Sequence, residues 1–433
     1  MLLVGHWNAF SGLCVLDLSL CRAIMLRKSP ECRLRCWRLL VVTPWFPNRP
    51  GDWPFPFVAE SCLALAEIGL EVDVVVARPW TPSWLARLSS VKTSATVDQA
   101  AFPTLASVSL VRYPAIPRGH LRHLGNRLLD VVISRTLQRI ASVRRPLAVL
   151  LHTEGLAPAS VATCRRLGLP VVVTIHGLNT DPHFLFTPAQ KARLAKALLD
   201  ASRVVLVGEP LRAFFAEYVG RDDHFRVVPN GVTIPPFEPM QVFTGSGDVR
   251  LMSVSNLLEG KGIDVTLRAL SRLREDGLLC WTYRIVGEGR ERPALEALVR
   301  TLGLADRVTF AGAVRHAAVN GELSEADVFV LPSFREAFGI AYLEAMAAGL
   351  LTIGVEGQGP SHFIRHGETG LLVPPQDVNA LAAMLRMVLT SDRQRWQTIA
   401  LAGSASARRE WSWEVHAHKL AAVLREAIED QRS

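Results

Sequence analysis

The sequence predicts an α/β protein with two Rossmann-like domains. The chain has 433 residues, more than the roughly 250–300 at which a single hydrophobic core stops growing. From residue 39 onward, short β-branched runs alternate with segments of helical periodicity, which is typical of βα units and a parallel sheet. A stretch rich in Pro and Gly follows residue 231, and the alternation then begins again. We therefore expect one domain on each side of this stretch.

The first half of the chain is expected to form an extension and one doubly wound domain. Residues 1–24 are apolar, but polar residues interrupt them and no basic segment precedes them, unlike a secretory signal. Because Met25 could begin the same protein, we expect residues 1–37 to be a disordered extension or the product of a misassigned start. The first domain then spans residues 38–233. Its expected strands are 39–43, 71–76, 147–152, 171–176 and 203–207, and its expected helices are 58–68, 157–167 and 188–199.

The second half repeats this organisation. Residues 234–248 are rich in Pro and Gly without periodicity and are expected to link the domains. The second domain spans residues 249–410, and a helix that bears Trp closes the chain within residues 411–433. The expected strands are 250–254, 282–286, 307–310, 328–331 and 351–355, and the expected helices are 263–273, 292–302, 317–323, 340–348, 378–389 and 413–430.

Composition and charge narrow the classes of function. Residues 1–230 hold 27 Lys and Arg against 16 Asp and Glu, whereas residues 231–433 hold 21 against 24, so the first half should face an anionic partner. The chain lacks aromatic-rich RNA motifs and Cys/His finger spacings, which argues against nucleic acid and favours phosphorylated acceptors or anionic lipid headgroups. No apolar run approaches the roughly 20 residues of a membrane-spanning helix. The seven cysteines lack paired spacing and are expected to be reduced thiols in a cytoplasmic protein.

The strongest chemical signal is the segment 328–349, which reads as strand, loop and helix. Glu336 and Glu344 lie eight residues apart, about 80° on an ideal helix, so both can face one cleft. Such carboxylates suit sugar or ribose hydroxyls, with two solvated glutamates on a surface helix as the alternative. A helix start also offers free amides that suit a diphosphate. These amides belong to Phe338, Gly339, Ile340 and Ala341.

Two loops that follow expected strands of the second domain carry further candidates. Lys261 is the one cation of the loop 254–262, which also holds Asn256 and opens a helix. It could neutralise a phosphate, although a lysine after a glycine is also common in solvated loops. Gly287, in the segment 286–289, turns the chain after a strand and is expected to line the pocket for a nucleotide base.

In the first domain, His176 and Gly51 stand at or beyond the carboxyl ends of expected strands. Ligands of open α/β sheets bind beyond these ends, so the position favours a function for His176, with a satisfied core histidine as the alternative. Gly51 lies in the loop 44–56, where the absence of a Cβ would let the backbone approach a phosphate or an acceptor.

Taken together, these segments resemble the donor site of the retaining family-4 glycosyltransferases of GT-B fold. The resemblance covers roughly residues 39–430 and rests on Glu336 and Glu344 with Phe338 and Gly339 between them, followed by segments 345–349 and 368–374. It implies two Rossmann-like domains that face each other across a cleft. It also implies that Glu344 binds ribose hydroxyls, that Glu336 binds donor-sugar hydroxyls, and that the amides of residues 338–341 hold the diphosphate.

The sequence departs from the family pattern at three places. The family commonly has an Arg where Asn256 stands, which leaves Lys261 as the main cation for the phosphate. The loop 44–56 lacks the double glycine of many relatives, and His362 replaces a residue that is usually acidic.

The function implied by the resemblance is transfer of a hexose from a nucleotide diphosphate sugar to a glycan or lipid-linked acceptor, with retention of anomeric configuration, in cell-surface polysaccharide or glycolipid synthesis. Glu336, His176 and Lys261 are the expected catalytic residues, and His176 should line the cleft. No acidic pair stands at a strand end, so we expect no metal, and no cofactor besides the sugar nucleotide as co-substrate. The alternatives are a sugar-nucleotide epimerase of the same fold and a catalytically silent GT-B binding subunit.

Two helices carry expectations beyond the donor site. Within residues 118–145, Arg122, Arg127, Arg135 and Arg139 are interleaved with leucine, valine and isoleucine. This pattern predicts a peripheral contact with the anionic inner face of a membrane, with an ordinary surface helix docked on the sheet as the alternative. The C-terminal helix has an apolar face longer than one small domain needs. By the resemblance, it should cross back from the second domain and pack on the first.

Overall fold

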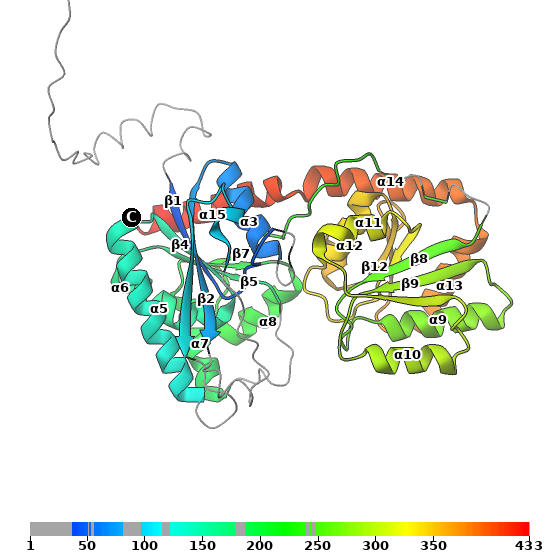
Figure 1. Cartoon of the computed structure of the whole chain (residues 1–433), viewed down its shortest axis with the longest axis horizontal. Helices are drawn as coiled ribbons and strands as arrows, with labels where there is room; N and C mark the ends of the chain where they lie inside the picture. The colour runs from blue at the N-terminus through cyan, green and yellow to red at the C-terminus, as the bar shows by residue number, and fades with distance from the viewer. Residues whose placement is uncertain are drawn as a thin grey trace, which may run out of the picture.

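The computed structural model describes residues 37–50, 52, 56–80, 97–114, 122–177, 187–239, 242–243 and 247–432. Two α/β domains lie side by side, and the last two helices of the chain run along one side of both (Figure 1). The first domain holds a seven-stranded sheet and the second a six-stranded sheet. The predicted fold class, two Rossmann-like domains, is therefore confirmed. The expected disordered extension lies outside the described residues except for Trp37.

The N-terminal sheet is parallel, with the order β3-β2-β1-β4-β5-β6-β7. Its strands are β1 (Arg38–Thr43), β2 (Glu71–Trp80), β3 (Ser107–Pro114), β4 (Ala148–His152), β5 (Val171–Ile175), β6 (Arg203–Leu206) and β7 (Phe225–Val227). Its helices are α3 (Pro56–Glu67), α5 (Arg122–Arg144), α6 (Ala157–Arg166), α7 (Pro188–Asp200) and α8 (Pro210–Val219).

Successive side chains of β1 point to opposite faces of the sheet, and apolar residues on both faces explain why helices cover both. Leu39 and Val41 pack in the hydrophobic cluster that contains the buried face of α3. Leu40 and Val42 point to the other face and pack in the cluster formed with α5, α6 and α7. All four side chains are at most 2% exposed, as expected for a strand buried on both faces.

The C-terminal sheet is also parallel, with the order β10-β9-β8-β11-β12-β13. Its strands are β8 (Val249–Val254), β9 (Trp281–Val286), β10 (Val308–Gly312), β11 (Val328–Val330), β12 (Leu351–Val355) and β13 (Leu371–Val373). Its helices are α9 (Ile263–Glu275), α10 (Arg292–Thr301), α11 (Val319–Leu323), α12 (Ile340–Ala348), α13 (Val378–Thr390) and α14 (Arg393–Glu410).

Several elements are absent from the sequence prediction, namely β3, α8, β7, β13 and α14. The strands β3 and β7 lie at the two edges of their sheet, where polar residues are tolerated and the apolar pattern is weak. Helix α14 contains Gly403, which is a poor helix former. A Cβ on Gly403 would lie 2.3 Å from the carbonyl oxygen of Thr369, so the glycine is required by close packing.

The last helix, α15 (Trp413–Asp430), leaves the second domain and packs on the first, against α3 (Figure 1). The crossing point is held by backbone contacts. Val232 N donates to the carbonyl of Trp411 at 2.8 Å. A Cβ on Gly231 would lie 2.5 Å from the Cα atom of Trp413. Glycine is therefore needed where the two segments pass each other.

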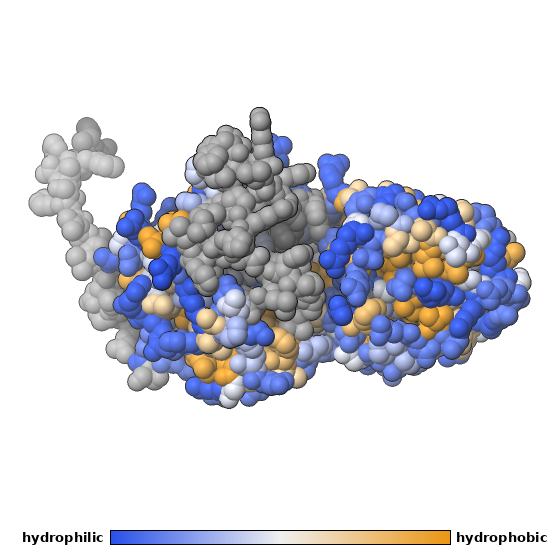
Figure 2. All heavy atoms as spheres, turned by 90° about the horizontal axis from the view of Figure 1, so that it is seen from below, coloured by the Kyte–Doolittle hydropathy of each residue, from blue (hydrophilic) through white to orange (hydrophobic). Residues whose placement is uncertain are grey.

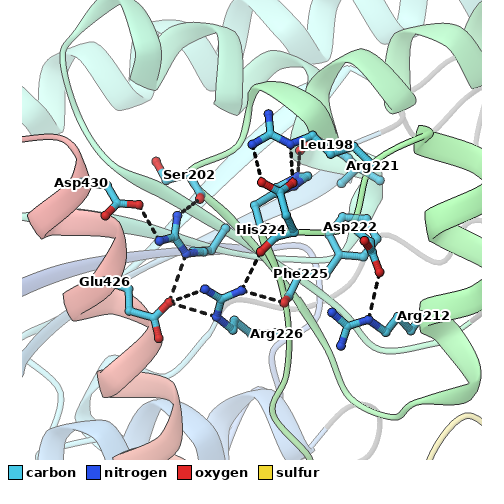
Figure 3. A network of polar contacts seen from close by, with 12 residues as sticks. Leu198, Ser202, Arg212, Arg221, Asp222, His224, Phe225, Arg226, Glu426 and Asp430 are labelled. Carbon is cyan, nitrogen blue, oxygen red and sulfur yellow. Dashed lines mark hydrogen bonds and ion pairs between the residues drawn. The ribbon is translucent and has the colours of Figure 1, made fainter.

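The far end of α15 is anchored to the first domain by two arginines from the neighbouring strands β6 and β7 (Figure 3). Arg203 of β6 donates through Nε to Glu426 at 3.2 Å and also pairs with Asp430. Arg226 of β7 donates to the same Glu426 carboxylate at 2.9 Å. Together with Leu420, Leu424 and Ile428 of α15, which are buried in the cluster below α3, these contacts make the helix part of the first domain.

Helix α5 differs from the predicted interfacial helix. Its apolar residues Ile133 and Leu137 are buried in the core, and Leu129 and Ile140 pack against it. Its exposed side chains include Arg127, Arg135 and Arg139, together with Val131, Gln138, Ser142 and Val143. Among residues 127–144, whose side chains the structure describes, no continuous apolar face is free to insert into a bilayer. On the parts of the surface that Figure 2 shows in colour, hydrophilic residues surround smaller apolar patches.

Candidate functional site

A cavity of about 640 Å³ lies between the two domains. The strand order explains its place, because the order reverses between β1 and β4 in one sheet and between β8 and β11 in the other. Ligands of open α/β sheets bind beyond the strands at such a switch point. Ten of the expected site residues line the cavity, namely Glu336, His176, Lys261, Glu344, Phe338, Gly339, Ile340, Ala341, Asn256 and Gly287. Gly51 lies outside the described residues.

Lys261 and Glu336 reach the cavity from two loops that are docked on each other, after β8 and after β11. Gly262 has a φ of 71°, and a Cβ on it would lie 2.2 Å from the carbonyl oxygen of Pro332. Only glycine allows the loops to approach so closely. Lys261 Nζ then lies 2.8 Å from Glu336 Oε2, in an ion pair whose side chains are 24% and 14% exposed.

Glu336 does not belong to the helix that carries Glu344, because α12 begins at Ile340. The argument that placed both carboxylates on one ideal helix is therefore wrong in its geometry. Both line the cavity because the loop after β11 is held by the loop after β12. Glu336 N donates to Gln358 Oε1 at 3.2 Å, and Gly359 N donates to the carbonyl of Glu336 at 2.9 Å.

The start of α12 forms one wall of the cavity. Gly339 precedes the helix with a φ of 92°, a conformation that favours glycine. The first amides of a helix have no partner inside it, and the positive end of the helix dipole adds to their attraction for an anion. Ile340 and Ala341 carry the first two of these amides, so this wall suits a diphosphate.

Glu344 projects from the middle of α12 and pairs with a histidine that the sequence reasoning did not single out. His316 Nε2 lies 2.9 Å from Glu344 Oε1. This hydrogen bond raises the pKa of His316, although burial opposes it, and the Glu344 and Glu60 charges raise it further. Glu60 belongs to α3 of the first domain and also lines the cavity.

His176 comes directly after β5 and lies among aromatic rings on the N-terminal side of the cavity. Its ring centroid is 4.7 Å from that of Phe57 and 5.1 Å from that of His152, with His176 Nε2 and His152 Nδ1 2.8 Å apart. Burial lowers the pKa of His176, and burial and the nearby His416 lower the pKa of His152 to about 3. Both rings are therefore neutral at neutral pH. His176 can exchange a hydrogen bond with a ligand but brings no positive charge.

Gly287 and Asn256 lie on the C-terminal side of the cavity. Gly287 has a φ of 135°, and a Cβ on it would lie 1.8 Å from the carbonyl oxygen of Ser255. The glycine is therefore required by the contact between the loops after β8 and β9. Asn256 is exposed in the same loop as Lys261 and supplies no cation.

Several residues that line the cavity escaped the sequence reasoning. They are Glu60, Asn230, Thr233, Arg315, His316 and Trp413. Most of them stand in no recognisable motif, and Trp413 reaches the cavity only because α15 crosses back to the first domain. His362, which replaces an acidic residue of the family pattern, is half-buried near Glu209 and is not part of the lining.

The described part of the chain shows neither a cluster of metal-ligating side chains nor a membrane-spanning helix. No group of three or more His, Cys, Asp or Glu side chains in it is arranged to hold a metal ion. Among its helices, none has the length and apolar character needed to cross a membrane.

Both domains match glycosyltransferase family models. Residues 56–234 match the model described as Glycosyltransferase Family 4, and residues 239–402 match the model described as Glycosyl transferases group 1. Among curated proteins, the chain is 29% identical over 406 residues to the GDP-mannose-dependent alpha-(1-6)-phosphatidylinositol monomannoside mannosyltransferase of Mycobacterium tuberculosis, covering 90% of this chain and 98% of that one. It is 30% identical over 268 residues to an exopolysaccharide phosphotransferase of Streptomyces coelicolor, covering 60% of this chain but only 26% of that one.

Solved structures show the same fold. The sucrose-phosphate synthase of Thermosynechococcus elongatus superposes with a TM-score of 0.71 at 21% identity, covering 91% of this chain and 100% of that one. HepE of Anabaena in complex with UDP superposes with a TM-score of 0.68 at 16% identity, covering 90% of this chain and 99% of that one.

Proposed function

Because the chain is a family-4 glycosyltransferase of GT-B fold, we propose that it transfers a hexose from a nucleotide diphosphate sugar to a glycan or lipid-linked acceptor, with retention of anomeric configuration. The observation that carries the proposal is that Glu336, Lys261, Glu344 and the start of α12 all line one cavity between the domains. A carboxylate pair, one ammonium group and free amides match the hydroxyls and the diphosphate of such a donor.

In the proposed donor complex, each part of the donor has its own partner. The diphosphate lies over the first amides of α12 and beside Lys261. The ribose hydroxyls donate to Glu344, and the hydroxyls of the transferred sugar donate to Glu336. Lys261 turns from Glu336 toward the phosphate when the donor binds, which releases the Glu336 carboxylate for the sugar.

The transfer breaks the bond between the anomeric carbon and the diphosphate oxygen and forms a bond from that carbon to the acceptor oxygen on the same face. The acceptor proton passes to the leaving diphosphate oxygen. Lys261 and the α12 amides stabilise the charge that develops on the diphosphate, and contributions of this kind are usually the largest in catalysis. They take the place of a metal ion in the proposal.

The acceptor is proposed to enter from the N-terminal side of the cavity, where Phe57 and His176 form its wall. An aromatic ring suits the apolar face of a sugar, and a neutral His176 can hydrogen-bond to an acceptor hydroxyl. The relatives are named for action on phosphatidylinositol monomannoside and for exopolysaccharide, which supports a lipid-linked or polysaccharide acceptor in cell-surface synthesis.

We propose that the enzyme works in the cytoplasm and approaches anionic lipid through the exposed arginines of α5. Arg127, Arg135 and Arg139 all lie on the solvent side of this helix. Because the apolar side of α5 is buried in the domain, the proposed contact is electrostatic and salt-sensitive rather than an insertion.

The proposal is tested by screening UDP- and GDP-sugars for thermal stabilisation, since a donor at 100 times its Kd stabilises by about 2.7 kcal/mol. Glu344→Gln should lose most of this stabilisation, while Glu368→Gln, an exposed residue outside the cavity, should keep it. The donor that binds is then incubated with acceptor sugars, and the anomeric configuration of the product is read by NMR. Conversion of the donor to an isomer without acceptor would instead indicate an epimerase, and the absence of stabilisation by every donor would contradict the proposal.

A further inference from the structure

Two ionisable residues from different domains line the same cavity as Glu344. His316 begins a short 3-10 helix, η4 (His316–Ala318), after β10 of the second domain. Glu60 stands on α3 of the first domain. Both line the cavity together with Glu344. Their meeting depends on the way the two domains face each other, because 256 positions of the chain separate Glu60 from His316.

The hydrogen bond from His316 restricts the Glu344 side chain. His316 Nε2 and Glu344 Oε1 are 2.9 Å apart, and the two side chains are 22% and 12% exposed. A carboxylate on a helix otherwise has several rotamers, and ordering it on binding costs free energy. The hydrogen bond that His316 donates to Oε1 orients the Glu344 carboxylate. This leaves Oε2 to accept hydrogen bonds from a ligand.

The charges around His316 favour its protonated form. It faces Glu344, which accepts its hydrogen bond, and Glu60 from the opposite domain; both raise the pKa of the imidazole. Burial raises the pKa of Glu60, the charges of Glu67 and Glu344 raise it further, and the charge of His316 opposes them. A protonated His316, hydrogen-bonded to Glu344 and under the charge of Glu60, is therefore favoured in this cluster.

We propose that His316 is a positioning residue for Glu344, and that the Glu60 carboxylate stabilises the charge of His316 from the other domain, so that the ribose site is complete only when the domains face each other. The inference rests on the proposed function, because it takes Glu344 as the carboxylate that binds the ribose. It goes beyond that function by assigning the first domain a part in donor binding.

The first experiment measures how strongly the protein prefers a ribonucleotide to its 2′-deoxy form. Calorimetric Kd values are obtained for UDP, GDP, 2′-deoxy-UDP and 2′-deoxy-GDP. We expect the wild-type protein to prefer the ribonucleotide by about tenfold or more, the range of a hydrogen bond to a charged group. His316→Ala should reduce this preference to about twofold or less. His316→Gln, whose amide can donate to Glu344, should restore most of it.

Two controls separate positioning from general damage. His418→Ala changes an exposed histidine of α15 and should leave the preference and the melting temperature unchanged. A structural defect in His316→Ala would weaken both forms of the nucleotide equally, whereas loss of positioning weakens mainly the form with the 2′-hydroxyl. An unchanged preference in His316→Ala overturns the inference.

The second experiment tests the contact between domains with a double-mutant cycle. Glu60→Gln should weaken the binding of the preferred diphosphate by about fivefold in the wild-type background and by less than about twofold in His316→Ala. Equal effects in both backgrounds overturn the role of Glu60. If neither UDP nor GDP binds the wild-type protein, the proposed donor class fails and the inference fails with it. Binding with an unaffected preference for ribose overturns the inference alone.

Discussion

Replacement of Lys261 by methionine tests the chemistry of the cavity directly. Methionine keeps most of the length of the lysine stem and removes the charge. The ammonium group lies 2.8 Å from Glu336 Oε2 and neutralises the leaving diphosphate in the proposed mechanism. Removal of one preorganised group of this kind costs about 3–4 kcal/mol of barrier. We therefore expect kcat to fall by about two to three orders of magnitude.

The same substitution leaves Glu336 without its cation. Because the carboxylate is 14% exposed, the pair is partly shielded from water. Its loss should cost about 1–3 kcal/mol of stability, between the values for exposed and buried ion pairs. The fold should survive this change. Lys196→Met is the matched control, since Lys196 is 77% exposed, pairs with Asp200 on the surface of α7, and should change neither stability nor kcat.

The assay measures kcat at saturating donor and acceptor, with the melting temperature recorded for each variant. Glu336→Gln should show a comparable fall in kcat, because it removes the partner proposed for the donor sugar. The reasoning is refuted if Lys261→Met and Glu336→Gln both fold and keep kcat within about threefold of the wild-type value.

Three further predictions follow from particular contacts. Gly231→Ala would place a Cβ 2.5 Å from the Cα atom of Trp413, so it should loosen the crossing of α15 and lower both stability and turnover. A Cβ on Gly247 has nothing within 4 Å, so Gly247→Ala should be neutral. Equal melting temperatures of the two variants would contradict this prediction. Burial lowers the pKa of His152 to about 3 and that of His416 to about 4 from an ordinary 6.5, so the unfolded chain binds more protons below pH 6.5 than the folded protein does. Chemical denaturation should therefore show that the free energy of unfolding falls by up to about 1.4 kcal/mol per histidine for each pH unit below 6.5. A free energy of unfolding that stays constant between pH 7 and 5 would exclude this prediction. Charge reversal of Arg127, Arg135 and Arg139 to Glu should abolish sedimentation with anionic liposomes at low salt without changing activity on a soluble acceptor, and wild-type protein that fails to sediment would rule out the membrane contact.

Much of the fold could be predicted because each strand and helix leaves a local pattern. The apolar run of β1 and the periodicity of α9 are visible without any neighbour. The missed elements lack such a pattern for identifiable reasons. Edge strands such as β3 are only partly buried, so their apolar pattern is weak. Helix α14 contains the poor helix former Gly403 because the close packing against Thr369 leaves no room for a Cβ.

The candidate site was predicted to the extent that its residues stand in short segments with their own chemistry. Lys261, Glu336 and Glu344 belong to strand–loop–helix units, and such units always end at the same edge of a parallel sheet. Glu60 and His316 carry no such mark. A single glutamate on a helix and a single histidine after a strand are common on protein surfaces, so nothing local distinguishes them.

The two-domain α/β architecture and the chemical nature of the donor wall follow from local sequence patterns, because periodicity and residue type are properties of a short stretch of chain. That Glu60, His316 and Trp413 line the same cavity as Glu344 is a result of the folded arrangement alone. Their meeting depends on the order of the strands in each sheet and on the crossing of α15 at Gly231, where the absence of a Cβ lets two backbones touch. These are contacts between segments far apart in the chain, and no local pattern encodes them.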